Sequence, residues 1–413
     1  MTRRCLSPAL ALTAALVALP AMAQTPEPGY FQVPGTDTRI SLYGYAALDC
    51  ALDLAGTLNY QGLSIFNDIL NGPAGVQGAH DTDQWQMTAA RSRFGFRSTT
   101  PTDIGDVKVR LECDFAGKNG GTNGQNSRQD LRVRHGYAEL AGFLIGQTDS
   151  TYEDPAAMAD TVDFNQPVGN WEALTRWTQV RYTFNPNQNV KVAFAIESPT
   201  TNYGSYYNDD KFPNNLVGAL DYKDAWGHVG FRLAWQDYAN FTAQNASATP
   251  PTPQIRYSTS AFSWVLSGNR FFGQDNLVAN IGKGNGYYGT GFNQDGPVKN
   301  AAGNAYLGVV SPILGSVGYT HKWNDKWRSN QVYTEVSWSE DDSLGINGAK
   351  MHTIKQFFIN SFYKPSKTTE IGVEYVWARS KNFSPNTVTL PDGSTTDGLY
   401  ESRIQANFTA KLW

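Results

Sequence analysis

The stretch 107–115, VKVRLECDF, alternates strictly between apolar and charged side chains. Successive side chains of an extended strand point to opposite faces, so this period of two separates an apolar face from a charged one. The same pattern returns at 39–53, 228–236, 370–377 and 403–412, and no comparable 3.6-residue period persists anywhere. The chain is therefore predicted to be an all-β protein.

The connections between the alternating segments are short and long in turn. Short turns fall at 99–105, 185–189, 224–227, 324–326 and 364–368. Long polar stretches rich in Gly, Asn and Pro fall between them, at 55–84, 117–130, 149–175, 198–213, 239–255, 284–304, 339–350 and 381–399. Counting the segments between these breaks predicts 16 strands, and the stretch 256–322 is the hardest to divide.

This asymmetry favours a barrel in an outer membrane, whose periplasmic turns are short and whose outer loops are long. An even number of strands leaves no unpaired edge in hydrocarbon. A periplasmic β-sandwich or propeller is the alternative, although such a protein has no reason to make every second connection long. We predict one domain, a transmembrane antiparallel β-barrel over 39–413, preceded by a short irregular periplasmic lead-in at 24–38.

The first 23 residues have the features of a secretory signal peptide. Two arginines precede an apolar run at 9–19, and Ala-Met-Ala at 21–23 supplies a small-x-small cleavage site. The apolar run is shorter than the roughly 20 residues that a spanning helix needs. We therefore expect 1–23 to be a signal peptide, and the protein to lie in the outer membrane of a Gram-negative bacterium.

Composition excludes several classes of function. A net charge of −4 at pH 7 argues against nucleic-acid binding, which needs a basic surface. Aromatic residues at 13% and 39 glycines suit a β protein with aromatic girdles and many turns. Cys50 and Cys113 lie in phase with apolar faces, so we expect small hydrophobic residues rather than a disulfide. No Cys/His group has metal-ligand spacing, and neither a metal nor another cofactor is predicted.

Catalytic signals are weak. The sequence contains neither GxSxG nor HExxH, and the GxGxxG match at 284–289 has no strand-then-helix unit around it. The five histidines are scattered along the chain. We predict that the protein is not an enzyme. A barrel hydrolase with a Ser–His pair from distant strands and a non-conducting structural barrel are the alternatives.

Cations gather on the polar faces of nearby segments in the first half of the chain. They are Arg91, Arg93, Arg97, Lys108, Arg110, Arg132, Arg134, Arg176 and Arg181. Adjacent barrel strands lie roughly 4.8 Å apart, so these side chains would form a basic wall. Arginine stays charged and binds carboxylates in a bidentate fork, so such a wall would attract anionic solutes. The alternative is that the arginines pair with lumen acids such as Glu112 and Asp114.

The long segment 149–175 carries acids and few cations. The acids are Asp149, Glu153, Asp154, Asp160 and Asp163. A barrel of this size needs something to narrow its channel, and a loop folded inward is the usual device. We predict that this segment folds into the barrel as a constriction loop that faces the basic wall. An ordinary exposed acidic loop is the alternative.

Five short runs between residues 90 and 184 carry more specific motifs. They are SRFGFRSTTPT at 92–102, RVRHGYAEL at 132–140, GQT at 146–148, DF at 163–164 and VRYT at 180–183. Taken together they resemble the DcaP-like porin family, and beyond them the likeness is one of pattern only. The resemblance implies a 16-stranded homotrimeric porin for small, often anionic solutes such as dicarboxylic acids.

The resemblance also implies roles for particular residues. By position, Arg93, Arg132, Arg134 and Arg181 would face the lumen, and 149–170 would enter the pore. We therefore expect passive diffusion of small hydrophilic, preferentially anionic solutes through a water-filled channel. The expected partners are those solutes, outer-membrane lipid and lipopolysaccharide.

Overall fold

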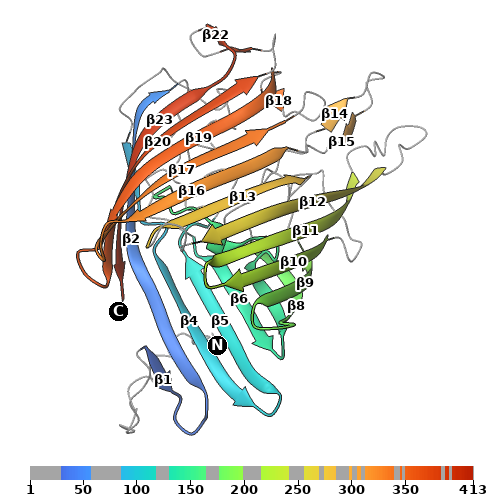
Figure 1. Cartoon of the computed structure of the whole chain (residues 1–413), viewed down its shortest axis with the longest axis vertical. Coiled ribbons are helices and arrows are strands. Elements are labelled where there is room, and N and C mark those ends of the chain that lie inside the picture. Colours follow the sequence, from blue (N-terminus) through green and yellow to red (C-terminus); the bar gives the residue numbers. More distant parts are fainter. Residues whose placement is uncertain are drawn as a thin grey trace, which may run out of the picture.

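The largest sheet of the chain is antiparallel and closes into a barrel (Figure 1). Two short hairpins lie outside it, β14 (Pro297–Lys299) with β15 (Ala305–Leu307) and β21 (Val388–Thr389) with β22 (Thr395–Thr396). The computed structural model describes residues 29–56, 85–117, 130–163, 176–198, 215–240, 255–268, 274–284, 297–299, 305–307, 312–338, 345–346, 349–382, 387–389 and 393–412. The barrel has 16 strands, as predicted, and closes where β23 (Tyr400–Lys411) pairs with β2 (Arg39–Gly56). The proposed signal peptide lies outside the described residues.

The segments 39–53, 107–115, 228–236, 370–377 and 403–412 overlap β2, β5, β11, β20 and β23, so the alternating pattern did identify strands. The barrel strands between β2 and β23 are β4 (Arg93–Thr102), β5 (Gly105–Asp114), β6 (Arg132–Leu140), β7 (Phe143–Asp149), β8 (Arg176–Phe184), β9 (Val190–Ser198), β10 (Asn215–Asp224), β11 (Gly227–Asn240), β12 (Ile255–Gly268), β13 (Asn276–Gly284), β16 (Ile313–Lys322), β17 (Trp327–Ser337), β19 (Ala349–Tyr363) and β20 (Thr369–Asn382), with β3 (Trp85–Thr88) in line with β4. Short strands outside the wall are β1 (Tyr30–Gln32), β14 (Pro297–Lys299), β15 (Ala305–Leu307), β18 (Gly345–Ile346), β21 (Val388–Thr389) and β22 (Thr395–Thr396).

The second barrel strand is broken in the middle. β3 and β4 both pair with β2, one beside its second half and the other beside its first half. In the gap, Ser92 Oγ accepts a hydrogen bond from Ala47 N at 2.9 Å and donates one to Ala47 O at 3.3 Å. A side chain thus satisfies backbone groups that the interrupted ladder leaves unpaired.

Polar and apolar side chains are distributed the opposite way from a soluble protein. On β20, the outward Val373 is 51% exposed whereas its inward neighbour Glu374 is 1% exposed. Other large apolar side chains on the outside include Phe94, Ile145, Phe194, Leu220, Trp264, Ile281, Val317 and Ile359. A soluble sandwich would bury such residues. The exposed band is therefore the surface that meets lipid.

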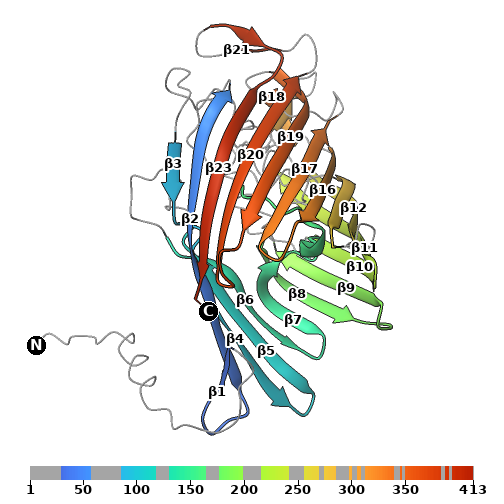
Figure 2. The same cartoon turned by 60° about the vertical axis from the view of Figure 1, so that its left-hand side comes forward.

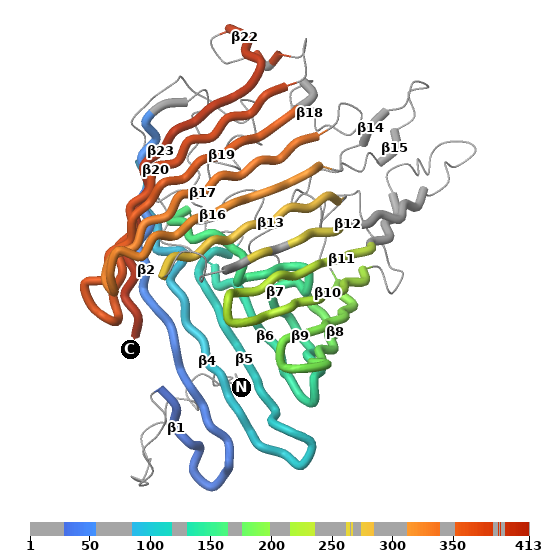
Figure 3. The backbone as a smooth tube through the Cα atoms, in the orientation of Figure 1, coloured from blue at the N-terminus to red at the C-terminus, as the bar shows by residue number. Residues whose placement is uncertain are grey.

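The connections differ from the prediction in two places. The turn predicted at 99–105 is shorter, because β4 continues to Thr102 and β5 begins at Gly105 (Figure 3). Within the lead-in at 24–38, residues 30–32 form β1, which pairs with β2, so that part is not irregular. A further short turn, implied by the count of 16 strands, joins β6 to β7, where Ala141 and Gly142 both have positive φ, as a tight two-residue hairpin requires.

Residues 150–163, which follow β7, fold into the barrel rather than away from it. They include the short 3-10 helix η2 (Pro155–Ala157), visible between the walls in Figure 2. The inner wall makes room for them with glycines: a Cβ on Gly318 would lie 2.8 Å from Ala159 Cβ, and one on Gly372 would lie 2.8 Å from Val162 Cγ2. The predicted inward fold is therefore confirmed for 150–163, whereas 164–175 lies outside the described residues. Among the described residues, no helix is long and apolar enough to span a membrane.

Candidate functional site

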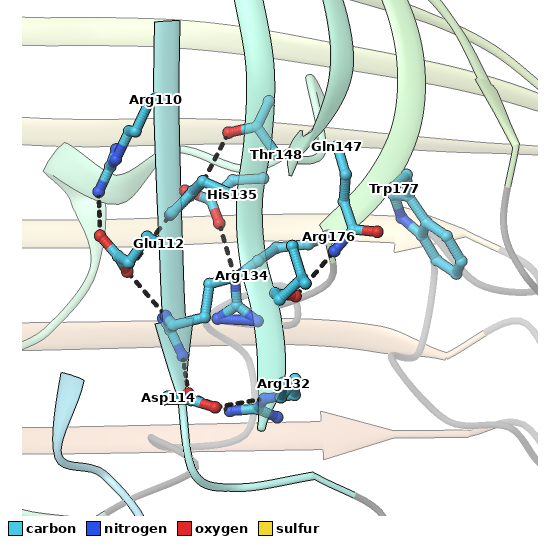
Figure 4. Close-up of polar contacts among 12 residues, drawn as sticks. Arg110, Glu112, Asp114, Arg132, Arg134, His135, Gln147, Thr148, Arg176 and Trp177 are labelled. Atoms are coloured by element: carbon cyan, nitrogen blue, oxygen red, sulfur yellow. Dashed lines mark hydrogen bonds and ion pairs between the residues drawn. The ribbon is translucent and has the colours of Figure 1, made fainter. Parts of the chain in front are cut away.

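A network of ion pairs joins β4, β5 and β6 on the inner face of the barrel (Figure 4). We call it the arginine network, and it consists of Arg93, Arg110, Arg132, Arg134, Glu112 and Asp114. Glu112 lies at its centre, 2.6 Å from Arg110 Nη2, 2.9 Å from Arg134 Nε and 3.0 Å from Arg93 Nη1. Three strands therefore share one carboxylate.

A β-bulge in β6 shapes this network. The register of β6 against β5 shifts at Arg134, which is an additional residue in the ladder. A bulge breaks the period of two, and so the consecutive residues Arg134 and His135 are both buried, at 6% and 3% exposure. Arg134 Nη1 reaches Asp114 Oδ2 at 2.7 Å, and Arg132 Nη2 donates to the same oxygen at 2.6 Å.

The acids of the network are buried, and some of its cations stay accessible. Glu112 and Asp114 are at most 1% exposed, whereas 34% of the Arg132 side chain and 23% of the Arg110 side chain are accessible. Four guanidinium groups against two carboxylates leave a net charge of about +2, since arginine stays ionised at any relevant pH. The surface that the network presents to the lumen is therefore basic.

The other predicted wall residues divide into two groups. Arg91 Nη2 lies 2.6 Å from Asp49, and Arg176 Nε lies 3.4 Å from Asp149, so both are paired. Within the described ranges, Arg97, Lys108 and Arg181 form no ion pair; the Arg97 guanidinium lies over the Tyr43 ring, 4.7 Å from its centroid. Part of the basic wall thus forms no ion pair in the described part of the chain, although Lys108 lies opposite Glu139 in the ladder.

A cavity of about 690 Å³ lies in the lumen between the inward loop and the short turns. Its cations are Lys108, Arg181, Lys191 and Arg232, and its acids are Asp106, Glu139, Asp149, Glu153 and Asp221. Lys191 Nζ and Arg232 Nη1 lie 2.9 and 2.7 Å from Asp221. Lys108 and Arg181 thus remain the cations of this cavity without an ion pair in the described part of the chain.

Two acids of the loop pair across the lumen with arginines that were not predicted as site residues. Arg232 Nη2 on β11 donates to Asp154 at 2.8 Å, and Arg328 Nε on β17 donates to Asp160 at 2.6 Å. Both arginines lie on the polar faces of alternating strands, which was the available signal. The sequence does not show which strands the loop lies against, and so it did not identify these two arginines as its partners.

Carboxylates on the wall also hold the loop by its backbone. Glu374 on β20 accepts hydrogen bonds from the backbone nitrogens of Val162 and Asp163, both at 2.9 Å. At the other end of the loop, Glu197 on β9 accepts from Thr151 N at 2.6 Å and from Ser150 Oγ at 2.7 Å. Both carboxylates are at most 1% exposed. The loop is therefore fixed at both ends of its described part. Of the predicted acids here, Asp163 also accepts from Gln405, and Glu153 is buried.

One group of side chains has the spacing of metal ligands. Ligand atoms of Asp154, Asp221 and His228 all lie within 4.8 Å of one another. Arg232 forms ion pairs with both carboxylates, however, so a guanidinium already offsets part of the negative charge of this group. A divalent cation beside Arg232 would be repelled, and we read the group as an ion-pair cluster that holds the loop.

Three of the described histidines have polar side-chain partners other than serine. His135 Nδ1 lies 2.9 Å from Thr148 Oγ1, His228 Nε2 lies 2.6 Å from Asp154, and His321 Nδ1 lies 2.9 Å from Asp275. The Ser–His pair that a barrel hydrolase needs is not formed by these three. The lumen geometry suits solute passage instead.

Comparison with known proteins agrees with this geometry. The family model of the porin subfamily matches residues 27–389. The chain belongs to this porin family. As a porin, it is located in the outer membrane of a Gram-negative bacterium, and its family and fold indicate a channel rather than an enzyme.

Individual relatives of this porin are distant. Porin Omp2b of Brucella neotomae is 23% identical over 340 residues, which cover 75% of this chain and 85% of that protein. The outer membrane channel DcaP of Acinetobacter baumannii matches with a TM-score of 0.72 at 20% identity, over 92% of this porin and 99% of that chain. An anion-selective porin from Comamonas acidovorans matches with a TM-score of 0.58 at 14% identity, over 91% and 100%. The DcaP-like resemblance is therefore confirmed.

Proposed function

We propose that this porin mediates passive diffusion of small hydrophilic, preferentially anionic solutes, with dicarboxylates among them. The observation that carries the proposal is the arginine surplus of the network, whose acids are buried while Arg132 and Arg110 stay accessible to the lumen. Oriented cations on one wall raise the local concentration of anions and lower the barrier to their entry.

The lining of the large cavity carries five acids against four cations, so its support for the proposal comes from two particular cations. Arg181 and Lys108 line it and form no ion pair within the described ranges, so their charge is available to a solute. A dicarboxylate has two separated anionic groups, and it could contact Arg181 in the cavity and then Arg132 in the network. Guanidinium groups suit carboxylates because their donors match the two oxygens.

We also propose the partners of the assembled pore. A homotrimer in outer-membrane lipid and lipopolysaccharide fits the exposed apolar band. Trimeric porins occur among the structural relatives, where OmpT of Vibrio cholerae is described in a trimer form. Chemical crosslinking in native membranes would test the proposal, and a band pattern that stops at the monomer would contradict it.

Planar-bilayer recordings test the selectivity. In a KCl gradient the wild-type pore should give a reversal potential displaced from zero toward the equilibrium potential of chloride. Arg132→Gln should move this reversal potential back toward zero. Arg132 is the most accessible member of the arginine network, so its loss removes charge from the lumen surface. Arg379→Gln is the matched control, because Arg379 is an exposed arginine on the outward face of β20.

The two variants must differ for the proposal to stand. A cation preference in the wild type, or the same shift in Arg132→Gln and Arg379→Gln, would contradict it. Liposome swelling with mono- and dicarboxylates, sugars and amino acids would then rank the solutes directly.

A further inference from the structure

A second, smaller cavity of about 110 Å³ lies at the short-turn end of the pore. Four cations line it, Lys322, Lys326, Arg328 and Lys364, together with the hydroxyl-bearing Thr320. Asp325 is the acid in its lining, and that side chain is 99% exposed. The strands that carry the cavity, β16, β17 and β19, are not neighbours of β4, β5 and β6 in the sheet, so it is separate from the arginine network.

Two adjacent turns bring the lysines together. Lys326 lies in the turn between β16 and β17, and Lys364 begins the turn between β19 and β20. Lys364 N donates a hydrogen bond to Lys326 O at 2.8 Å, which fixes the two turns side by side. Like charges on adjacent rigid turns repel each other, and an anion between them would remove that repulsion.

Two acids near the cavity form ion pairs with Arg328. Its Nε lies 2.6 Å from Asp160 and its Nη1 lies 2.7 Å from Glu370. Lys364 Nζ is 3.5 Å from the same Glu370.

The remaining two lysines are also weakly paired or unpaired within the described residues. Lys322 Nζ is 3.5 Å from the exposed Asp325, longer than a strong charge-assisted hydrogen bond. Lys326 forms no ion pair within the described part of the chain. The lysines of the cavity therefore keep most of their capacity to bind an anion.

We propose that this cavity binds a small soluble oxyanion, of the size and charge of a phosphate group, at the periplasmic mouth of the pore. Ammonium groups bind phosphate as point charges from several directions, and the Thr320 hydroxyl adds a neutral donor. Thr320 and Lys322 lie in phase with Gly318, which faces the inward loop, so the cavity opens to the water of the pore and not to lipid. The site depends on the porin fold and not on the proposed anion preference.

Inorganic phosphate is the probe, applied to single channels of the full-length porin in bilayers of zwitterionic lipid. Phosphate added on the side of the short turns should reduce the chloride current and saturate, while the same addition on the other side should act more weakly. The double variant Lys326→Gln, Lys364→Gln should raise the half-saturating concentration about tenfold or more, because two charged donors are lost. Lys223→Gln, which removes an exposed lysine from the β10–β11 end outside the cavity, should leave it unchanged.

Several outcomes would overturn the site. These are a linear, unsaturable response to phosphate, equal half-saturation in the wild type and the double variant, or an effect that depends on anionic lipid and thus points to a lipid headgroup. An unchanged conductance of the double variant in plain KCl shows that it is folded. The reversal potential in a KCl gradient reports the anion preference separately, so a failure of one proposal is distinguishable from a failure of the other.

Discussion

Arg134 bonds to both carboxylates of the arginine network, and its side chain is 7% exposed. Its removal would leave Glu112 and Asp114 buried with one positive charge fewer. We expect Arg134→Met to lower the free energy of unfolding by about 3 kcal/mol, the range found when one partner of a buried ion pair is lost. Urea unfolding in lipid vesicles, followed by tryptophan fluorescence, measures the change.

Arg97→Met is the control for that measurement, because Arg97 is exposed and has no ion pair in the described ranges. Its cost should stay below about 1 kcal/mol, as for exposed charges generally. Equal unfolding midpoints in the two variants would show that the network contributes nothing to stability.

At this scale the sequence grouped cations on the polar faces of strands, but it did not reveal how they are paired. Parity along a strand places Arg132 and Arg134 inward, and the structure agrees. The same alternation along β6 would place the side chain of His135 outward, but His135 is buried. The bulge at Arg134 shifts the alternation by one residue. A bulge depends on how two strands meet, and one strand's sequence does not reveal it.

The inward loop is the element on which the pore's width depends, and Asp154 is one of its attachments. Burial raises the pKa of the Asp154 carboxyl, but the hydrogen bond from His228 and the charge of Arg232 outweigh it, and the pKa is lowered from its ordinary value of 3.8. The stabilisation from this ionised group is therefore complete above about pH 4, and it is lost as the pH falls through the lowered pKa.

We accordingly expect open-channel current to be steady from pH 7 to about pH 4 and to fluctuate below that, as this attachment weakens. Asp154→Asn should show the fluctuations already at pH 7, whereas Asp325→Asn, at a fully solvated turn, should behave like the wild type. Single-channel recordings across this pH range provide the test. Fluctuations of the wild type that begin near pH 6 would assign the loop's attachment to another group.

Elements whose partners are far away in the sequence were the hardest to predict. The size of the barrel and the position of 149–175 along the chain indicated an inward loop, and its described part, 150–163, is inward. The arginines that receive it, Arg232 and Arg328, lie on β11 and β17, far along the chain. Only the closed barrel brings them opposite the loop.

For the whole molecule, the barrel closes through the pairing of β23 with β2, and this pairing has a defined register. Cys50 on β2 lies opposite Ala406 on β23. Directly opposed residues of antiparallel strands have Cβ atoms about 4.5–5.5 Å apart, close to disulfide range. We expect Ala406→Cys, in a Cys113→Ser background, to form a disulfide with Cys50 on mild oxidation.

Denaturing gels would detect this crosslink as a band whose mobility changes on reduction. Ala410→Cys is the control, because its partner is Ala46 and it should stay reduced. A crosslink in the control and not in Ala406→Cys would mean that the closing strands are shifted. The strand count and the alternation were predictable from sequence, since both are local; the break between β3 and β4 was not, because it shows only against β2.

The alternation that gives this barrel its apolar outside and polar inside also bears on how the protein reaches its destination. A nascent segment halts in the cytoplasmic membrane only when apolar residues dominate a window of about 19 positions. The strands here alternate polar or charged side chains with apolar ones. An unfolded chain therefore crosses the cytoplasmic membrane without being inserted in it. The continuous apolar surface forms only when the strands fold into the barrel, in the outer membrane.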